Sequence, residues 1–139
     1  MFEAICKDKL APLMLRLALG LICVTHGYLK IMATGGTNWQ PGMAVGWQLV
    51  IAWGEFAAGL AVLVGFRCRL FAALAIVIVA GTLAWWQGWG VLRLPIRSLE
   101  PTLLVLFIGG ALLLLGGGEL SVDGKSMGRA MARAPARRR

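Results

Sequence analysis

The chain has 139 residues, of which 59% are hydrophobic and only 14% are charged. A soluble domain carries about a quarter charged residues, so the composition excludes an ordinary soluble protein and indicates a single-domain membrane protein. The net charge of +8 does not indicate a nucleic-acid partner, because six basic residues crowd positions 125–139 and no recognition motif accompanies them.

The first apolar stretch, from about Leu10 to Ala33, is long enough to cross a membrane. It follows a segment of mixed charge and exceeds the apolar core of a signal peptide, so we expect the chain to retain it. Arg16 lies near its start, and we expect the guanidinium to snorkel to the interface. His26, the single histidine of the chain, and Lys30 lie near its end, one helical turn apart.

Further apolar stretches predict spans over about 47–66, 70–91 and 99–117. Short connections join the four spans, so we predict an all-α four-helix membrane bundle over residues 1–120. Residues 121–139 are turn-rich and then basic, and we expect them to form a disordered tail. We expect Asp123 within this tail, and Glu119 just before it, to be solvated.

Small residues mark where the predicted helices can approach closely in lipid. They recur seven residues apart in the first span and at three- and four-residue steps in the second. The positions are Gly20 and Gly27, then Gly54, Ala58, Ala61 and Gly65.

Basic residues divide unequally between the two sides of the predicted bundle. With four spans, both termini and the 67–69 turn share one side, which holds ten lysines and arginines. The other side holds three, namely Lys30, Arg93 and Arg97. The positive-inside rule therefore places both termini in the cytoplasm, where the basic tail contacts anionic lipid.

The polar groups that lipid makes costly lie at matching depths on the outer side. At helical rise, His26 is about 10 Å inside the end of its span and Glu55 about 12 Å inside the start of the second. The two side chains can face each other, with Lys30 one turn above His26. A charge in lipid is costly, so we expect Glu55 to be protonated or paired, and the three groups are candidates for a ligand or proton site. A structural His26–Glu55 hydrogen bond is the alternative.

These three residues supply a base, a cation and an acid, which suits hydrogen bonding or proton transfer to a quinone head group. No motif predicts a bound cofactor. One histidine cannot supply two axial imidazoles, so we do not expect haem. The cysteines, Cys6, Cys23 and Cys68, lack metal-type spacing, so we expect free thiols and no metal site.

Two more polar residues lie on the outer side. Glu100 stands between Ser98 and Pro101, a pattern typical of a helix start, which favours a helix-dipole role over chemistry. Gln87 ends the third span and is a second candidate for the polar site.

All six tryptophans fall near the outer interface, where an aromatic belt explains most of them. Their one-sided placement leaves open an aromatic-lined slot for a flat ligand. The six are Trp39, Trp47, Trp53, Trp85, Trp86 and Trp89.

Three segments, in this order, carry a resemblance to a known family. They are "LRLALGLICVTHGYLKI" (15–31) with its His-Gly pair, "GEFAAGLAVLVGFRCRLFAALA" (54–75) with its leading acid and basic turn, and "LEPTLLVLFIGGALLLLGGGELSVD" (99–123). Over about residues 10–124 the chain resembles the DoxX family of small four-helix membrane proteins. That family often carries another polar or histidine residue late in the third span, where this chain offers only Gln87.

The resemblance implies a bacterial-type inner-membrane subunit of a redox complex, with quinone on the substrate side and other membrane subunits as partners. Some relatives look like subunits of thiosulfate:quinone oxidoreductases. This implies a part in a quinone-dependent oxidoreductase, without catalysis by this chain alone. Two alternatives stay open: a non-catalytic accessory subunit of a large assembly, and a small-molecule or ion carrier, against which polar groups on one leaflet argue.

Overall fold

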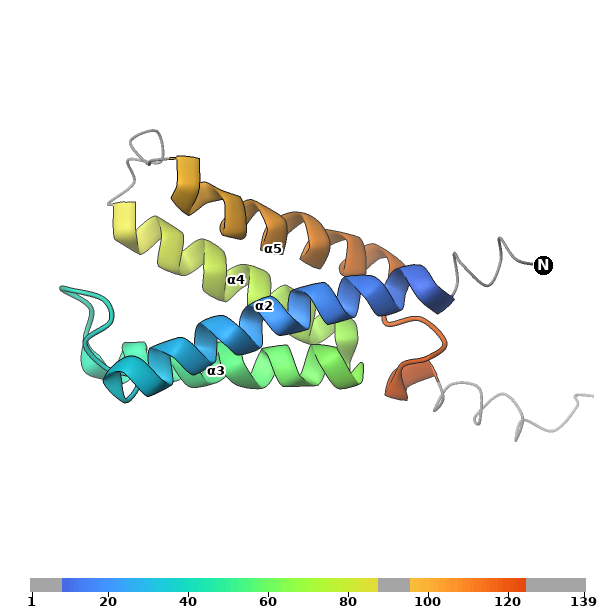
Figure 1. Ribbon diagram of the computed structural model, residues 1–139, viewed down its shortest axis with the longest axis horizontal. Coiled ribbons are helices and arrows are strands. Elements are labelled where there is room, and N and C mark those ends of the chain that lie inside the picture. Colours follow the sequence, from blue (N-terminus) through green and yellow to red (C-terminus); the bar gives the residue numbers. More distant parts are fainter. Residues whose placement is uncertain (1–8, 88–95, 125–139) are drawn as a thin grey trace, which may run out of the picture.

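The computed structural model describes residues 9–87 and 96–124 of the chain, and in this part the secondary structure is helical with connecting turns. Four long helices follow one another in antiparallel order (Figure 1). They are α2 (Ala11–Thr34), α3 (Val45–Val64), α4 (Cys68–Gln87) and α5 (Ile96–Leu115). This arrangement confirms the prediction of an all-α bundle.

Three of the four described helices are of membrane-spanning type. By length and composition, α2, α3 and the Cys68–Trp85 part of α4 are long and apolar enough to cross a membrane. The apolar part of α5, Thr102–Leu115, is shorter. The end of the predicted third span, at 88–91, lies outside the described residues.

Helix ends differ from the predicted ends by a few residues. The second span was expected to reach Phe66, but α3 ends at Val64 because Gly65 adopts a left-handed φ of 77°. The Gly65 N–H then donates to the carbonyls of Ala61 and Val62, which closes the helix. Helix α5 likewise ends at Leu115, two residues before the predicted end, where Gly116 has a φ of 77°.

The most extensive helix contact joins α2 to α3. A Cβ atom on Gly27 would lie 2.6 Å from the backbone nitrogen of Phe56, and one on Gly59 would lie 2.7 Å from that of Val24. The two backbones therefore meet where glycine alone fits. Gly20 and Gly27 were predicted as contact points. Gly59 was missed because the predicted series of small residues in this span included its neighbour Ala58 instead.

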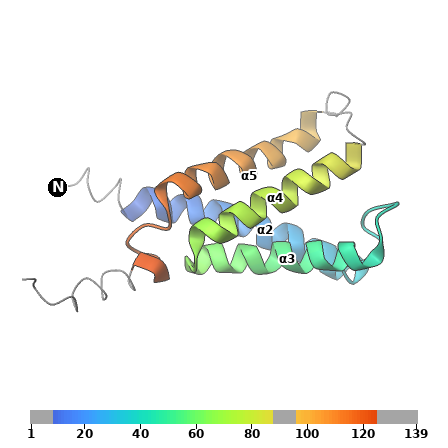
Figure 2. The ribbon, with the colours of Figure 1, turned by 180° about the vertical axis from the view of Figure 1, so that it is seen from behind.

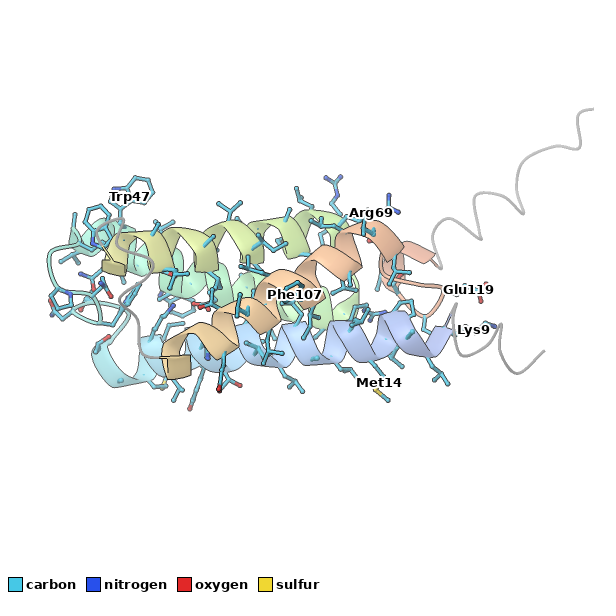
Figure 3. All side chains as sticks on the ribbon, turned by 90° about the horizontal axis from the view of Figure 1, so that it is seen from above. Lys9, Met14, Trp47, Arg69, Phe107 and Glu119 are labelled. Carbon is cyan, nitrogen blue, oxygen red and sulfur yellow. The ribbon has the colours of Figure 1, made fainter. Side chains whose placement is uncertain are left out.

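The bundle is apolar both inside and outside. Buried apolar residues from all four helices form its core, while large apolar side chains such as Phe107 and Leu114 are 75% and 84% exposed. Met14, 63% exposed, points away from the bundle (Figure 3). Such outward faces need lipid around them, so the chain is a membrane protein.

Arg16 does not snorkel, and that prediction is wrong. Its side chain is 3% exposed and its guanidinium donates to three carbonyls. Nε and Nη2 bond Val62 and Leu63 at the end of α3, at 3.2 and 2.8 Å, and Nη1 bonds Gly117 beyond α5 at 3.1 Å. Val62 and Leu63 lie at the C-terminal end of α3, where the helix dipole places partial negative charge, so their carbonyls favour the buried cation.

Residues 121–124 pack against the bundle. Asp123 Oδ2 accepts a 2.9 Å hydrogen bond from the Cys68 N–H at the start of α4, and Ser121 is 1% exposed. The expectation of a solvated Asp123 is therefore wrong, because its carboxylate accepts from the first N–H of α4, which has no partner within the helix itself. The remainder of the tail expected over 121–139, residues 125–139, lies outside the described residues.

Two ends of the bundle are distinct in both ribbon views. The loop over residues 35–44 lies at one end, and the start of α2 lies with the 116–124 segment at the other (Figures 1 and 2).

Candidate functional site

A buried ion pair lies between α2 and α3. Glu55 on α3 has a side chain only 1% exposed, and its Oε2 accepts a hydrogen bond from the ammonium of Lys30, whose side chain is 21% exposed. The close backbone contact of Gly27 with Phe56 brings these turns together, since Lys30 follows Gly27 by one turn and Glu55 precedes Phe56. Lys30, considered less central from the sequence, is thus the direct partner of the carboxylate.

His26 lies beside this ion pair. Its Nδ1 is 3.7 Å from Glu55 Oε1, which is beyond hydrogen-bond range, and its side chain is 42% exposed. The structure thus brings His26 and Glu55 together as expected, without a direct hydrogen bond between them. We call Lys30, Glu55 and His26 the polar cluster.

Trp39 covers the cluster at the loop end. The Lys30 ammonium lies 4.5 Å from the centroid of its ring, a cation–π contact. The indole Nε1 donates to the carbonyls of Gly36, at 3.2 Å, and Gln48, at 3.3 Å, which fixes the ring. Trp39 is therefore part of the site, whereas most of the tryptophans were expected only to form an interfacial belt.

Gln48 organises the loop and was missed by sequence reasoning. It is 2% exposed, and its Nε2 donates to the carbonyls of Gln40 and Met43 at 3.0 and 2.7 Å. Its Oε1 accepts from the Gln40 N–H at 3.2 Å. The available signal was an amide side chain within the first turn of an apolar span, which must satisfy its polar atoms nearby.

Glu100 does not join the cluster. It is exposed on α5, and no ion pair among the described residues includes it. The helix begins at Ile96, so Glu100 stands in its second turn and the helix-start interpretation is wrong. Gln87 is the last residue of α4, and its side chain lies outside the described part.

The other described tryptophans lie outward. Trp47, Trp53 and Trp85 are 66%, 53% and 55% exposed, as in an interfacial belt, and Trp53 contacts Phe56 edge-on with ring centroids 6.3 Å apart. The Trp86 side chain and Trp89 lie outside the described residues.

Side chains that could bind a metal, and thiols, are sparse in the described part of the chain. Residues 9–87 and 96–124 contain no set of three His, Cys, Asp or Glu side chains that could hold a metal ion. Cys23 and Cys68 are buried free thiols.

Comparison with known proteins gives one match. The DoxX family model matches residues 11–88, which include α2, α3, α4 and the whole polar cluster. Neither the curated proteins nor the solved structures yield a match. Because the match covers more than half of the 139 residues, the chain belongs to the DoxX family.

Proposed function

We propose that the chain is an integral subunit of a redox complex in a bacterial-type inner membrane, and that its polar cluster binds a quinone head group. Both termini lie in the cytoplasm, as the distribution of basic residues indicates. One observation carries the proposal: a buried Lys30–Glu55 pair adjoins a His26 side chain that is 42% exposed at membrane depth.

The exposure of His26 favours a ligand that arrives through lipid. His26 lies eight residues before the end of α2, which is about 12 Å at helical rise. Leu29, the next residue on this face toward the loop, is apolar and 56% exposed. Trp39 covers Lys30 at the loop end. A lipophilic ligand therefore has a path to His26 that a water-soluble one lacks.

The donor set suits a carbonyl ligand. The ammonium of Lys30 has three N–H donors, of which Glu55 uses one, and imidazole can accept or donate a proton near neutral pH. When bound, a quinone supplies two-electron, two-proton redox chemistry. Lys30 would orient a carbonyl oxygen, His26 would hold or release a proton at its exposed edge, and Glu55 would hold the Lys30 ammonium in place.

The test uses His26→Ala and Glu55→Gln in native membranes, with Thr25→Val, an exposed neighbour on α2, as the matched control. We expect the two variants to assemble normally and to lose about a hundredfold in quinone-dependent turnover, the lower range for a lost acid–base group. Full retention of turnover in both variants would contradict the proposal.

An accessory role without chemistry is the second candidate. The direct bond between Lys30 and Glu55 favours it. Such a pair can lock α2 to α3 with no ligand. In that case the Glu55→Gln chain would reduce assembly of the complex, while the assembled fraction would keep its specific activity. A carrier is not proposed, because the described core between Arg16 and Glu55 is apolar, with Leu19, Cys23 and Val62 buried there.

A further inference from the structure

A cleft opens at the end of the bundle opposite the polar cluster. Its volume is about 760 Å³, and it lies between the start of α4 and the chain that follows α5. Arg67, Arg69 and Leu70 line one wall, and Leu115 and Gly116 line the other. Figure 3 shows Arg69 at the same end as Lys9 and Glu119, far from Trp47. We call this the arginine cleft.

The arginine cleft is shaped around the Arg69 guanidinium. A Cβ atom on Gly116 would lie 3.4 Å from Arg69 Nε, so the guanidinium lies directly against the glycine backbone. Its Nη2 also approaches the Leu114 carbonyl at 3.4 Å. Arg69 is therefore held at the wall of the cleft while its remaining N–H groups stay available, and it is exposed.

The acidic residues at the cleft already have partners. Glu119 pairs with Lys9 at 3.1 Å, and Asp123 accepts from the Cys68 N–H. Arg67 is exposed like Arg69, and neither is in an ion pair with another described residue. Two positive charges thus face one cleft without a carboxylate partner in the described part of the chain.

Apolar side chains adjoin these charges. Leu70 and Leu115 line the cleft and are each 56% exposed, and Phe66 beside Arg67 is 49% exposed. Apolar surface on α4 and α5 therefore begins directly at the two arginines, where the helices enter lipid. A ligand that satisfies both features has an anionic head and apolar chains.

We propose that the arginine cleft binds the phosphate of an anionic phospholipid from the membrane leaflet at this end of the bundle. Arg67 and Arg69 bind the phosphate oxygens, and the acyl chains lie along Leu70 and Leu115. Guanidinium groups bind phosphate in bidentate fashion, and basic pockets between membrane helices select anionic head groups. This site is independent of the polar cluster.

The test is native mass spectrometry of the full chain in detergent, titrated with phosphatidylglycerol and with phosphatidylcholine of the same acyl chains. We expect tighter binding of phosphatidylglycerol. In the Arg67→Gln/Arg69→Gln chain this preference falls by about fivefold for each arginine removed. The charge-matched control is Arg137→Gln/Arg138→Gln, which changes two arginines outside the described residues and is expected to leave the preference within about twofold of the wild-type value.

Further arms separate the sources of the effect. An Arg67→Lys/Arg69→Lys chain keeps the charge and is expected to retain most of the preference, while circular dichroism checks that each variant keeps its helices. Equal affinity for the two lipids, or equal losses in the cleft and control variants, would overturn the proposal. Displacement of bound phosphatidylglycerol by millimolar inorganic phosphate would also overturn it, because a free anion would then be the ligand.

Discussion

Replacing Lys30 with methionine leaves the Glu55 carboxylate, 1% exposed, without its closest partner. Removing one member of a buried pair costs about 3–5 kcal/mol of the free energy of unfolding. We expect the low end, about 3 kcal/mol, because Lys30 is itself 21% exposed and His26 stays 3.7 Å from the carboxylate. Glu55→Met costs less, about 1.5 kcal/mol, since the long Lys30 side chain can reach toward water.

The double variant Lys30→Met/Glu55→Met restores an apolar contact and is expected to cost only about 1 kcal/mol, so the coupling energy is about 3.5 kcal/mol. This value exceeds that of a neutral hydrogen bond between membrane helices, about 0.6 and at most about 1.7 kcal/mol. The assay is equilibrium unfolding in mixed micelles, followed by tryptophan fluorescence.

The matched control is the exposed pair Lys9–Glu119, whose side chains are 44% and 65% exposed. The cycle Lys9→Met/Glu119→Met is expected to give a coupling energy below about 1 kcal/mol, because water screens exposed pairs. A Lys30–Glu55 coupling no larger than the control value would refute the assignment of a buried ion pair.

The same unfolding assay checks three further changes. Arg16→Met removes a donor from three carbonyls and is expected to lower stability by about 3 kcal/mol or more, with Arg16→Lys recovering part of the loss; a change below about 1 kcal/mol would contradict the three-carbonyl contact. Gly27→Ala places a methyl group 2.6 Å from the Phe56 nitrogen and is expected to cost about 1–3 kcal/mol, so a neutral effect would refute the tight contact. Asp123→Ala removes the cap on the Cys68 N–H and is expected to cost about 1 kcal/mol; unchanged stability would show that the cap contributes nothing.

The helices of this chain follow from local sequence, whereas their polar contacts do not. Apolar length alone predicts α2, α3 and α4 to within a few residues, because lipid requires every span to satisfy its own backbone. The depth of His26 and Glu55 also follows from helical rise. Whether Lys30 or His26 bonds the Glu55 carboxylate depends on how α2 packs against α3 where Gly27 contacts Phe56. No local sequence pattern contains that packing.

Arg16 shows the limit most clearly. Judged from its own helix, it lies near enough to an end to reach water. Its three acceptors lie 46, 47 and 101 positions away, on elements that meet only in the folded bundle. Gln48 and Asp123 were missed for the same reason, since each satisfies backbone groups of a loop or helix that is identified only after the fold is known.

The most direct test of the proposed function is purification of the chain from native membranes in mild detergent, with mass spectrometry of its protein partners and lipid-soluble contents. The proposal predicts stoichiometric redox subunits together with bound quinone, and loss of that quinone, with assembly intact, in the His26→Ala chain. Recovery of the chain alone, or of a complex whose quinone content is unchanged by His26→Ala and Glu55→Gln, would contradict it.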